Sequence, residues 1–421
     1  MRSHRRLAAS VGLCVLIAAT YAGAGDWPQW RGPNRDGISQ ETGLLKEWPG
    51  EGPKLVWQVN DLGRGFSTPA VAGGRVYLMA SQGVEDEFVK ALDGKNGKPI
   101  WSTRVGKVGN PKQQPNFPAA RSTPTVDGDV LYALGSDGDL ACIELATGKI
   151  RWQKSLRGDF GGKPGNWAYA ESPLIDGETL VCAPGGGQAT LVALNKKTGA
   201  VIWKCALPEA DDAAYTSAVI MEAAGVRQYV QVVQKGLVGV EAKTGKFLWR
   251  YGKTMSTYGA TIPSPVVGDG IVYSAGSGSG GGAVRPVARG GGVEAEQVYF
   301  DAKLPTAIGG SVLVGGHLYG CSAQVLVCAD FKTGQIKWTD RGAAPGSLCY
   351  ADGRLYLHGE NGEVALVEAT PDGYREHGRF MPPNPPRRIS GMEKAWAYPV
   401  VCDGRLYIRD HDLLWCYDVR K

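Results

Sequence analysis

The side chains that could support catalysis are scattered along this chain, and their spacing matches no catalytic site. Asp137 and Asp139 form a carboxylate pair, but Gly138 between them is typical of a turn. No Gly-x-Ser-x-Gly sequence occurs, and no serine has a recognisable base partner. The histidines lack the spacing of metal ligands: His4, His317, His358, His377 and His411. The sequence therefore predicts no catalytic residue and no metal site.

A second group of residues combines aromatic rings with one pair of opposite charges. Its members lie just before apolar runs of the chain: Arg121, Trp167, Tyr169, Glu171, Tyr258 and Trp396. Aromatic rings with a charged pair suit the binding of a ligand or of a partner's polypeptide segment. The alternative is structural, with the rings covering a hydrophobic core and Arg121 paired with Glu171.

These residues are positioned by a motif that the chain repeats. Residues 122–152, 171–204, 263–276 and 325–338 share alternating apolar and polar runs, separated by glycine-containing turns. Self-similarity at a period of roughly 40–50 residues, with four strands in a unit, is typical of a β-propeller. Eight copies can be counted on an apolar pair in the second strand: Val76-Tyr77, Leu131-Tyr132, Leu180-Val181, Tyr229-Val230, Val272-Tyr273, Leu318-Tyr319, Leu355-Tyr356 and Leu406-Tyr407.

The fourth strand of most copies carries a tryptophan, which follows a Thr-Gly turn in several of them. It occurs at Trp101, Trp152, Trp203, Trp249 and Trp338, and the fifth and seventh copies have Tyr299-Phe300 and Phe380 instead. The eighth copy ends after three strands, and residues 54–59 (KLVWQV) are expected to supply its fourth. The expected fold is thus all-β, an eight-bladed β-propeller of four-stranded antiparallel blades over residues 54–421, closed by an N-terminal strand.

Loop lengths indicate which face of the propeller carries function. The long segments 105–121, 157–170, 276–292 and 381–397 are all expected to be loops on one face, whereas the other face has minimal turns. The six aromatic and charged residues above should ring the channel mouth on that decorated face. Residues 25–53, whose stretch 27–37 holds two tryptophans and Arg31, are expected to form an extended clamp across the blades.

The N-terminal residues indicate export from the cytoplasm. Residues 1–24 contain Arg2, Arg5 and Arg6, an apolar run and a small-residue end, which predicts a signal peptide cleaved after Ala24. The apolar run is too short for a membrane span, and Leu13 before Cys14 argues against a lipid anchor. The expected location is periplasmic or secreted. Without the three arginines the net charge falls from +5 to +2, which argues against nucleic acid as a partner.

The cysteines of this exported protein are expected to be either buried free thiols or partners in disulfides. Three of them occupy equivalent third-strand positions, where other copies have alanine, and are expected to be buried thiols: Cys142, Cys328 and Cys416. Disulfides among Cys182, Cys205, Cys321, Cys349 and Cys402 stay open, although no two cysteines are adjacent.

The copies resemble the pyrroloquinoline quinone (PQQ) repeat, whose core pairs Ala-Leu-Asp with Thr-Gly and tryptophan. Ala91-Leu92-Asp93 matches it, as does Ala193-Leu194-Asn195 with Thr198-Gly199 and Trp203. Together with the opening DWPQWRGPNRDG at 26–37, the resemblance covers nearly the whole chain after the predicted signal peptide. The same repeat builds quinoprotein dehydrogenases and also the non-catalytic propeller lipoprotein of the outer-membrane barrel-assembly machinery.

The resemblance implies two functions of different classes. The preferred one is a non-catalytic, monomeric scaffold without cofactor, which binds a protein or peptide of the cell envelope. The alternative is a quinoprotein dehydrogenase acting on alcohols or sugars, with PQQ and calcium over the channel. Such enzymes hold PQQ between a tryptophan and a disulfide of adjacent cysteines, and this chain has no such pair, so no catalytic residue is carried over. A carbohydrate-binding propeller is a third reading.

Overall fold

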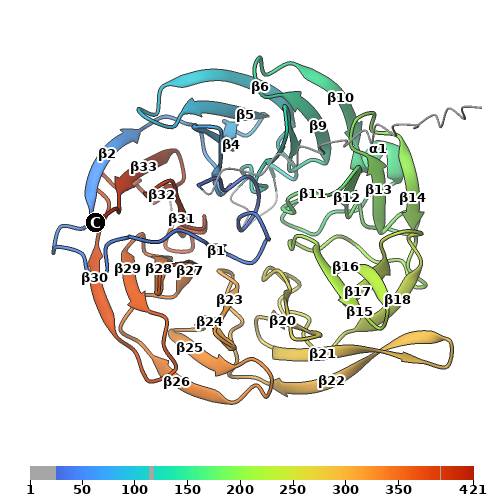
Figure 1. The fold of residues 1–421 in the computed structure, drawn as a ribbon. Coiled ribbons are helices and arrows are strands. Elements are labelled where there is room, and N and C mark those ends of the chain that lie inside the picture. Colours follow the sequence, from blue (N-terminus) through green and yellow to red (C-terminus); the bar gives the residue numbers. More distant parts are fainter. Residues whose placement is uncertain (1–24, 113–117, 389) are drawn as a thin grey trace, which may run out of the picture.

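The computed structural model describes residues 25–112, 118–388 and 390–421. Eight blades, each of four antiparallel strands, surround a central axis (Figure 1). The predicted eight-bladed β-propeller is confirmed. The predicted signal peptide, residues 1–24, lies outside the described residues. The helix of the described part, α1 (Leu156–Phe160), is one turn long, and no helix there is long and apolar enough to cross a membrane.

The blades follow one another around the ring in chain order. The first four are β3 (Ala70–Ala72), β4 (Arg75–Gln82), β5 (Asp86–Asp93), β6 (Pro99–Lys107); β7 (Thr125–Asp127), β8 (Val130–Leu134), β9 (Asp139–Glu144), β10 (Ile150–Ser155); β11 (Leu174–Asp176), β12 (Thr179–Cys182), β13 (Leu191–Asn195), β14 (Val201–Cys205); and β15 (Val219–Ala223), β16 (Val226–Val233), β17 (Gly236–Glu241), β18 (Phe247–Tyr251).

The last four blades complete the circle. They are β19 (Val266–Gly268), β20 (Ile271–Gly276), β21 (Gly280–Arg289), β22 (Gly292–Asp301); β23 (Ser311–Val314), β24 (His317–Ser322), β25 (Val325–Asp330), β26 (Ile336–Asp340); β27 (Gly346–Ala351), β28 (Arg354–Gly359), β29 (Val364–Glu368), β30 (Glu376–Phe380); and β31 (Val400–Cys402), β32 (Arg405–Asp410), β33 (Leu413–Asp418) with β2 (Lys54–Val59).

The eighth blade is closed by the N-terminal strand, as expected. Strand β2 pairs antiparallel with β33, with Trp57 opposite Cys416 in the register. Cys142 is likewise opposite Tyr132 on one side and Trp152 on the other, so the cysteine fills the small central position of its blade. The eight cysteines of the described residues are all buried free thiols.

The repeated tryptophan and glycine form the junctions between blades. The Trp101 ring of blade 1 packs on Gly148 of blade 2, where an added Cβ would lie 2.8 Å from the ring. Its indole Nε1 also donates to the carbonyl of Leu145 at 2.9 Å. In the fifth blade Tyr299 replaces the tryptophan and keeps this bond, because its hydroxyl donates to the carbonyl of Phe331 at 2.9 Å. These bonds anchor the outer strand of a blade to the next blade, whereas in the fourth blade the indole of Trp249 donates to Gln228 within its own blade.

The glycine-rich segment 276–292 was expected to be a loop, and this prediction is wrong. Most of it forms strand β21, which pairs with the equally long β22 in a hairpin that extends beyond its blade (Figure 1). The glycines are needed because large rings occupy the adjacent space. A Cβ on Gly281 would lie 2.0 Å from the hydroxyl of Tyr273, and one on Gly282 would lie 2.9 Å from that of Tyr251.

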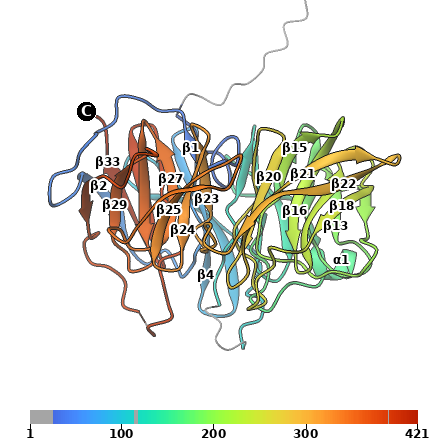
Figure 2. The ribbon, with the colours of Figure 1, turned by 90° about the horizontal axis from the view of Figure 1, so that it is seen from below.

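The segment before β2 crosses the channel at the face opposite the long loops (Figure 2). Trp27 exchanges two backbone hydrogen bonds with Val71 of blade 1. The guanidinium of Arg35 donates to the carbonyl of Ser172 in blade 3 at 2.8 Å, and that of Arg31 donates to the carbonyl of Ser311 in blade 6. Strand β1 (Ile38–Ser39) then adds parallel to β27 of blade 7. The segment therefore contacts blades all around the ring.

Candidate functional site

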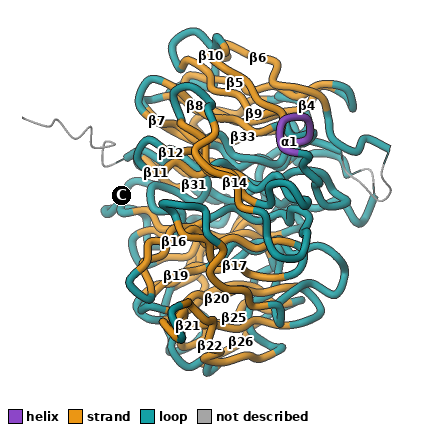
Figure 3. Tube along the Cα trace, turned by 90° about the vertical axis from the view of Figure 1, so that its right-hand side faces the viewer, coloured by secondary structure: helices purple, strands orange, loops and turns teal. Residues whose placement is uncertain are grey.

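A cavity of about 380 Å³ opens at the mouth of the central channel, on the face that carries the long loops. Figure 3 shows this face at the right-hand side, together with α1. The lining comes mainly from loops that precede the innermost strands: Trp30, Phe66, Arg121, Trp167, Ala170, Tyr215, Ser256, Tyr258, Ala260, Ile262, Ser277, Ile308, Met392, Trp396 and Tyr398. We call it the channel-mouth pocket.

Aromatic pairs form the walls and the floor of the channel-mouth pocket. Phe66 and Trp396 pack with ring centroids 4.9 Å apart, and Trp167 and Tyr215 with centroids 5.9 Å apart. The hydroxyl of Tyr215 also accepts a hydrogen bond from the backbone N–H of Trp167 at 3.1 Å. These edge-on and tilted contacts are favourable geometries for aromatic rings, so they hold the walls in place.

The floor of the pocket comes from the N-terminal segment. Trp30 meets Tyr398 edge-on, with ring centroids 4.6 Å apart. The indole of Trp30 donates to Ser264 Oγ at 3.3 Å, and the hydroxyl of Tyr398 donates to the carbonyl of Ile308 at 3.2 Å. Because the segment enters from the opposite face, it makes the far end of the pocket blind.

Arg121 is the one charged residue among those that line the pocket in the described part of the chain. Its guanidinium lies over the Phe66 ring, 5.4 Å from the centroid, and donates to the carbonyl of Ala119 at 2.8 Å. Burial lowers the pKa of Arg121 to about 10, against the opposing influence of Glu87, so the group stays cationic at neutral pH. The pocket is thus an aromatic cavity with a single positive charge.

Four of the six residues singled out in the sequence line this pocket: Arg121, Trp167, Tyr258 and Trp396. Tyr169 and Glu171 are instead buried behind it. The hydroxyl of Tyr169 donates to the carbonyl of Pro184 at 2.7 Å. Glu171 Oε1 accepts from the backbone N–H of Ala183 at 2.6 Å, and desolvation raises the pKa of this carboxyl to about 8 despite the nearby Arg35.

Several lining residues escaped the sequence prediction. Phe66, Tyr215 and Tyr398 precede their innermost strands just as Arg121 and Trp396 do, so the alignment of the copies contained that signal. Trp30 carried no such signal, because it belongs to the N-terminal segment outside the repeats.

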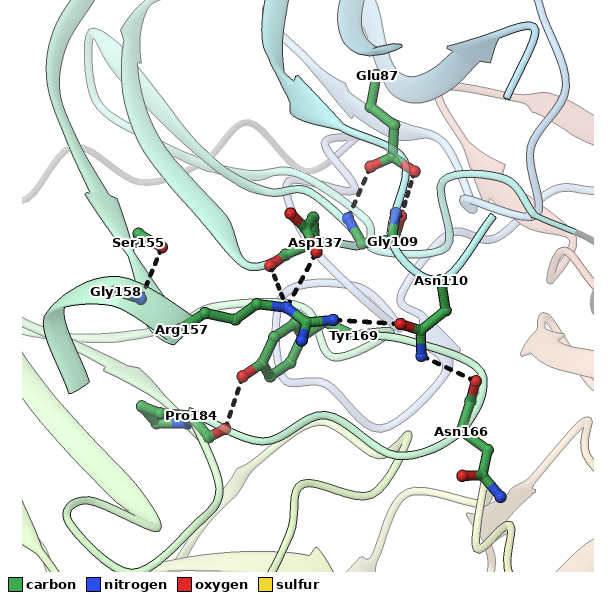
Figure 4. Close-up of polar contacts among 11 residues, drawn as sticks. Glu87, Gly109, Asn110, Asp137, Ser155, Arg157, Gly158, Asn166, Tyr169 and Pro184 are labelled. Atoms are coloured by element: carbon green, nitrogen blue, oxygen red, sulfur yellow. Dashed lines mark hydrogen bonds and ion pairs between the residues drawn. The ribbon is translucent and has the colours of Figure 1, made fainter. Parts of the chain in front are cut away.

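The loops beside Arg121 are fixed by a polar network (Figure 4). Arg157 on α1 pairs with Asp137 at 2.9 Å and donates to the amide oxygen of Asn110 at 3.4 Å. The amide nitrogen of Asn110 donates in turn to the carbonyl of Asn166 at 3.1 Å. Asp137 therefore belongs to a structural turn, and loops 105–121 and 157–170 are joined to each other.

A buried carboxylate lies beneath this network. Glu87 on β5 accepts from the backbone N–H and the hydroxyl of Ser136 at 2.7 and 2.5 Å, and the Ser136 hydroxyl accepts from the N–H of Gly109 at 2.8 Å. Desolvation raises the pKa of Glu87 to about 7, although these bonds and Arg121 act in the other direction.

The loop that carries Met392 and Trp396 is anchored by buried charges. Arg388 donates to both carboxylate oxygens of Asp410, at 3.0 and 2.7 Å. Glu393 pairs with Arg64 and lies 3.4 Å from His411 Nδ1. Burial and the neighbouring arginines lower the pKa of His411 to about 3, so the ring is neutral at physiological pH.

The channel-mouth pocket does not match a site for PQQ with calcium. Its side chains from the described residues include no carboxylate and no amide, the groups that hold calcium in the quinoprotein enzymes. No group of three or more histidine, cysteine, aspartate or glutamate residues in the described ranges is arranged to bind a metal ion. The tryptophans alone would not hold the cofactor, so we derive no chemistry through it.

Comparisons of the sequence with known proteins point to one family. Residues 38–183 and 85–340 match the family model described as outer membrane protein assembly factor BamB, which together is more than half of the chain. The factor of this name from Moranella endobia is 28% identical over 124 residues, which are 28% of this chain and 31% of that protein. That from Shewanella oneidensis is 25% identical over 238 residues, 55% of this chain and 53% of the relative.

A tetrathionate hydrolase from Acidithiobacillus ferrooxidans is 24% identical over 230 residues, 52% of this chain and 43% of that enzyme. The chain thus spans about half or less of the length of these curated relatives.

Solved structures show the same fold. BamB from Moraxella catarrhalis superimposes with a TM-score of 0.60 at 15% identity, covering 87% of this chain and 99% of the other. A quinohemoprotein alcohol dehydrogenase from Comamonas testosteroni gives 0.53 at 13% identity, covering 94% of this chain and 80% of the other. At such identities the likeness concerns the fold alone. On the match of the family model, which extends over most of the propeller, the chain belongs to the family of the outer membrane protein assembly factor BamB.

Proposed function

We propose that this protein is a non-catalytic scaffold of the cell envelope, which binds a protein or peptide through the channel-mouth pocket and its rim. The observation that carries the proposal is an aromatic cavity on the decorated face whose described lining has no acid–base pair, nucleophile or metal-ligand set. Deep apolar pockets with aromatic walls are where partner side chains contribute most binding energy. The relatives named as outer membrane protein assembly factors support the envelope location and a protein partner.

The test is affinity capture from a detergent extract of the cell envelope. The wild-type protein is compared with a Trp167→Ala/Trp396→Ala double variant and with Ile202→Ala, which alters a half-exposed side chain on the outer strand β14. We expect wild type and Ile202→Ala to capture the same proteins and the double variant to lose them. Identical capture by all three would contradict the proposal, provided that all three melt at similar temperatures.

The dehydrogenase reading is tested on the same preparations. PQQ and Ca²⁺ are titrated into the purified protein while quinone absorbance and dye reduction with alcohols or sugars are followed. Since no lining residue supports the cofactor, we expect no saturable binding at micromolar PQQ. Dye reduction that depends on PQQ would show that the protein is an enzyme and would contradict the proposed scaffold function.

A further inference from the structure

The rim of the channel-mouth pocket exposes apolar side chains on two sides of the channel. Tyr258, before β19, is 73% exposed, and Met392, in the loop before β31, is 61% exposed. The blades that these loops serve lie on different sides of the channel, three blades apart in the ring, at the labels β20 and β31 in Figure 1. Exposed apolar groups around a cavity are typical of an interaction surface. Both side chains line the pocket and also extend from it into solvent, so a segment that spans the mouth would cover apolar surface that a ligand held deep in the cavity would leave in water.

The cavity beneath the rim has the size and lining for a large apolar side chain. About 380 Å³ is at the lower end of the range for small-ligand pockets, and Phe66, Trp167, Tyr215 and Trp396 form its walls. An inserted aromatic ring would make the edge-on and offset contacts that these walls already make with one another. Because Trp30 and the N-terminal segment lie at the far end, a side chain can enter from the mouth, whereas a polypeptide chain would have to pass that segment to thread through.

The charge of the pocket restricts the partner further. Arg121 contributes the guanidinium, and no carboxylate from the described residues lines the cavity. A guanidinium in a partly desolvated wall forms stronger hydrogen bonds with a carboxylate than with a neutral group. An acidic residue next to the inserted ring would therefore be favoured over its amide.

Resting on the function proposed above, we propose that the partner is an extended, internal stretch of polypeptide that crosses the mouth from Tyr258 to Met392. It inserts one aromatic side chain into the cavity and places the carboxylate of an adjacent aspartate or glutamate against Arg121. The proposal joins three observations: the apolar rim on both sides, the blind aromatic cavity and its single cation.

The test uses three fluorescein-labelled peptides with Gly-Ser flanks and the centres Asp-Phe-Asp, Asn-Phe-Asn and Asp-Ala-Asp. Fluorescence anisotropy gives their affinities for the wild type, for Arg121→Gln and for Arg151→Gln. Arg151 is the matched control, since it lies in the same blade, on β10, and pairs with Asp129 at the surface. We expect the wild type to bind the Asn-Phe-Asn peptide and the Asp-Ala-Asp peptide each about tenfold more weakly than the Asp-Phe-Asp peptide. This is the scale of losing a charge-assisted pair or a buried ring.

Whether Arg121 pairs with the peptide carboxylate is tested by combining the protein variants with the Asp and Asn peptides. With Arg121→Gln, the difference between the Asp and Asn peptides should shrink to less than about twofold, whereas Arg151→Gln should keep it. Equal affinity of wild type for the Asp and Asn peptides, or an undiminished difference with Arg121→Gln, would overturn the proposal. If Arg121→Gln does not fold, Arg121→Lys serves instead, and it should retain part of the difference because it retains the charge.

Two further measurements distinguish a crossing polypeptide segment from a small ligand held in the cavity. A Tyr258→Ala/Met392→Ala variant, altered only at exposed side chains, should weaken the Asp-Phe-Asp peptide. Free phenylacetate should displace the labelled Asp-Phe-Asp peptide poorly. If it displaces the labelled peptide as well as the unlabelled peptide does, the ligand is a small aromatic acid and not a crossing segment. If envelope proteins are captured through Trp167 and Trp396 while the peptides do not discriminate, the scaffold function stands and this inference fails.

Discussion

Glu87 does not line the pocket, but it influences Arg121, which does. It lies fully buried below the loops that carry Arg121, and its carboxyl is held by Ser136 and, more weakly, by Ser81. Desolvation raises its pKa to about 7, and that of Glu171 to about 8. Both carboxyls therefore bind protons in the folded protein at pH values where the unfolded chain has released them.

This difference lowers the free energy of unfolding as the pH rises from about 5 to 8, whereas the depressed pKa of buried His411 raises it below about pH 6.5, so a net fall is predicted between about pH 6.5 and 8. Over that window the folded state binds more protons than the unfolded state, so raising the pH favours unfolding. Each carboxyl contributes a slope of at most about 1.4 kcal/mol per pH unit. Because Glu87→Gln lacks the contribution of this carboxyl, its free energy of unfolding should rise relative to that of wild type as the pH increases from about 5 to 7.

Urea unfolding at pH 5, 6, 7 and 8 measures this slope. Glu209→Gln is the matched control, since the Glu209 side chain is 76% exposed, and it should leave the slope unchanged. An equal slope in wild type and Glu87→Gln would show that Glu87 is not the group responsible.

At this scale the sequence predicted part of the site. Arg121 and Trp396 could be placed at the channel mouth because the strand that follows each of them is short and runs along the axis. The orientation of Tyr169 could not be predicted, since it depends on the path of loop 157–170, where Ala168 adopts a positive φ of 68°. Trp30 could not be predicted either, because nothing in its local sequence indicates a contact with Tyr398.

At the scale of the element, the junction between tryptophan and glycine explains why the motif is repeated. Trp57 on β2 donates to the carbonyl of Gly94 in blade 1 at 3.0 Å, and a Cβ on Gly97 would lie 2.9 Å from its ring. The strand and the turn that receives it must therefore change together. In the hairpin β21–β22 the strands continue past the position of this turn, to Arg289 and Gly292. The repeated turn motif is therefore missing there, and the glycines alone suggested a loop.

Trp57→Ala should reduce the free energy of unfolding by about 3–5 kcal/mol, as large-to-small changes in a core do. Leu55→Ala on the same strand should cost less than about 0.5 kcal/mol, since Leu55 is 38% exposed. Chemical denaturation of both variants measures the two values. A loss for Trp57→Ala no larger than that for Leu55→Ala would mean that the closing strand is not held by this junction.

At the scale of the whole molecule, residues 25–53 join the blades from inside. Trp27, Leu44 and Trp48 are at most 5% exposed, and all three belong to the core cluster of blades 1, 7 and 8. The sequence indicated a clamp through Trp27, Trp30 and Arg31. It could not indicate the path across the channel, because that path depends on contacts with six or more separate blades.

Two truncations separate the contribution of this segment from that of β2. A chain that begins at Pro53 keeps β2, and it should still unfold cooperatively but with a free energy lower by several kcal/mol, because each buried apolar side chain contributes about 2 kcal/mol. A chain that begins at Leu62 loses β2 as well, which leaves β33 as an open edge, and it should aggregate. Thermal unfolding followed by circular dichroism, with size-exclusion chromatography, tests both. If the chain from Leu62 melts like the longer one, the ring is not closed by β2.

The pairing of β2 with β33 also has a consequence for how the molecule folds. The strand that is synthesised near the beginning finds its partner only in the last blade, with Lys54 opposite Asp418. Contacts between residues so distant in sequence raise the contact order, which slows folding, because the entropy of closing the loop is lost before the contacts form. The ring can therefore be completed only after the whole chain has been made, and until then β2 lacks the strand with which it pairs.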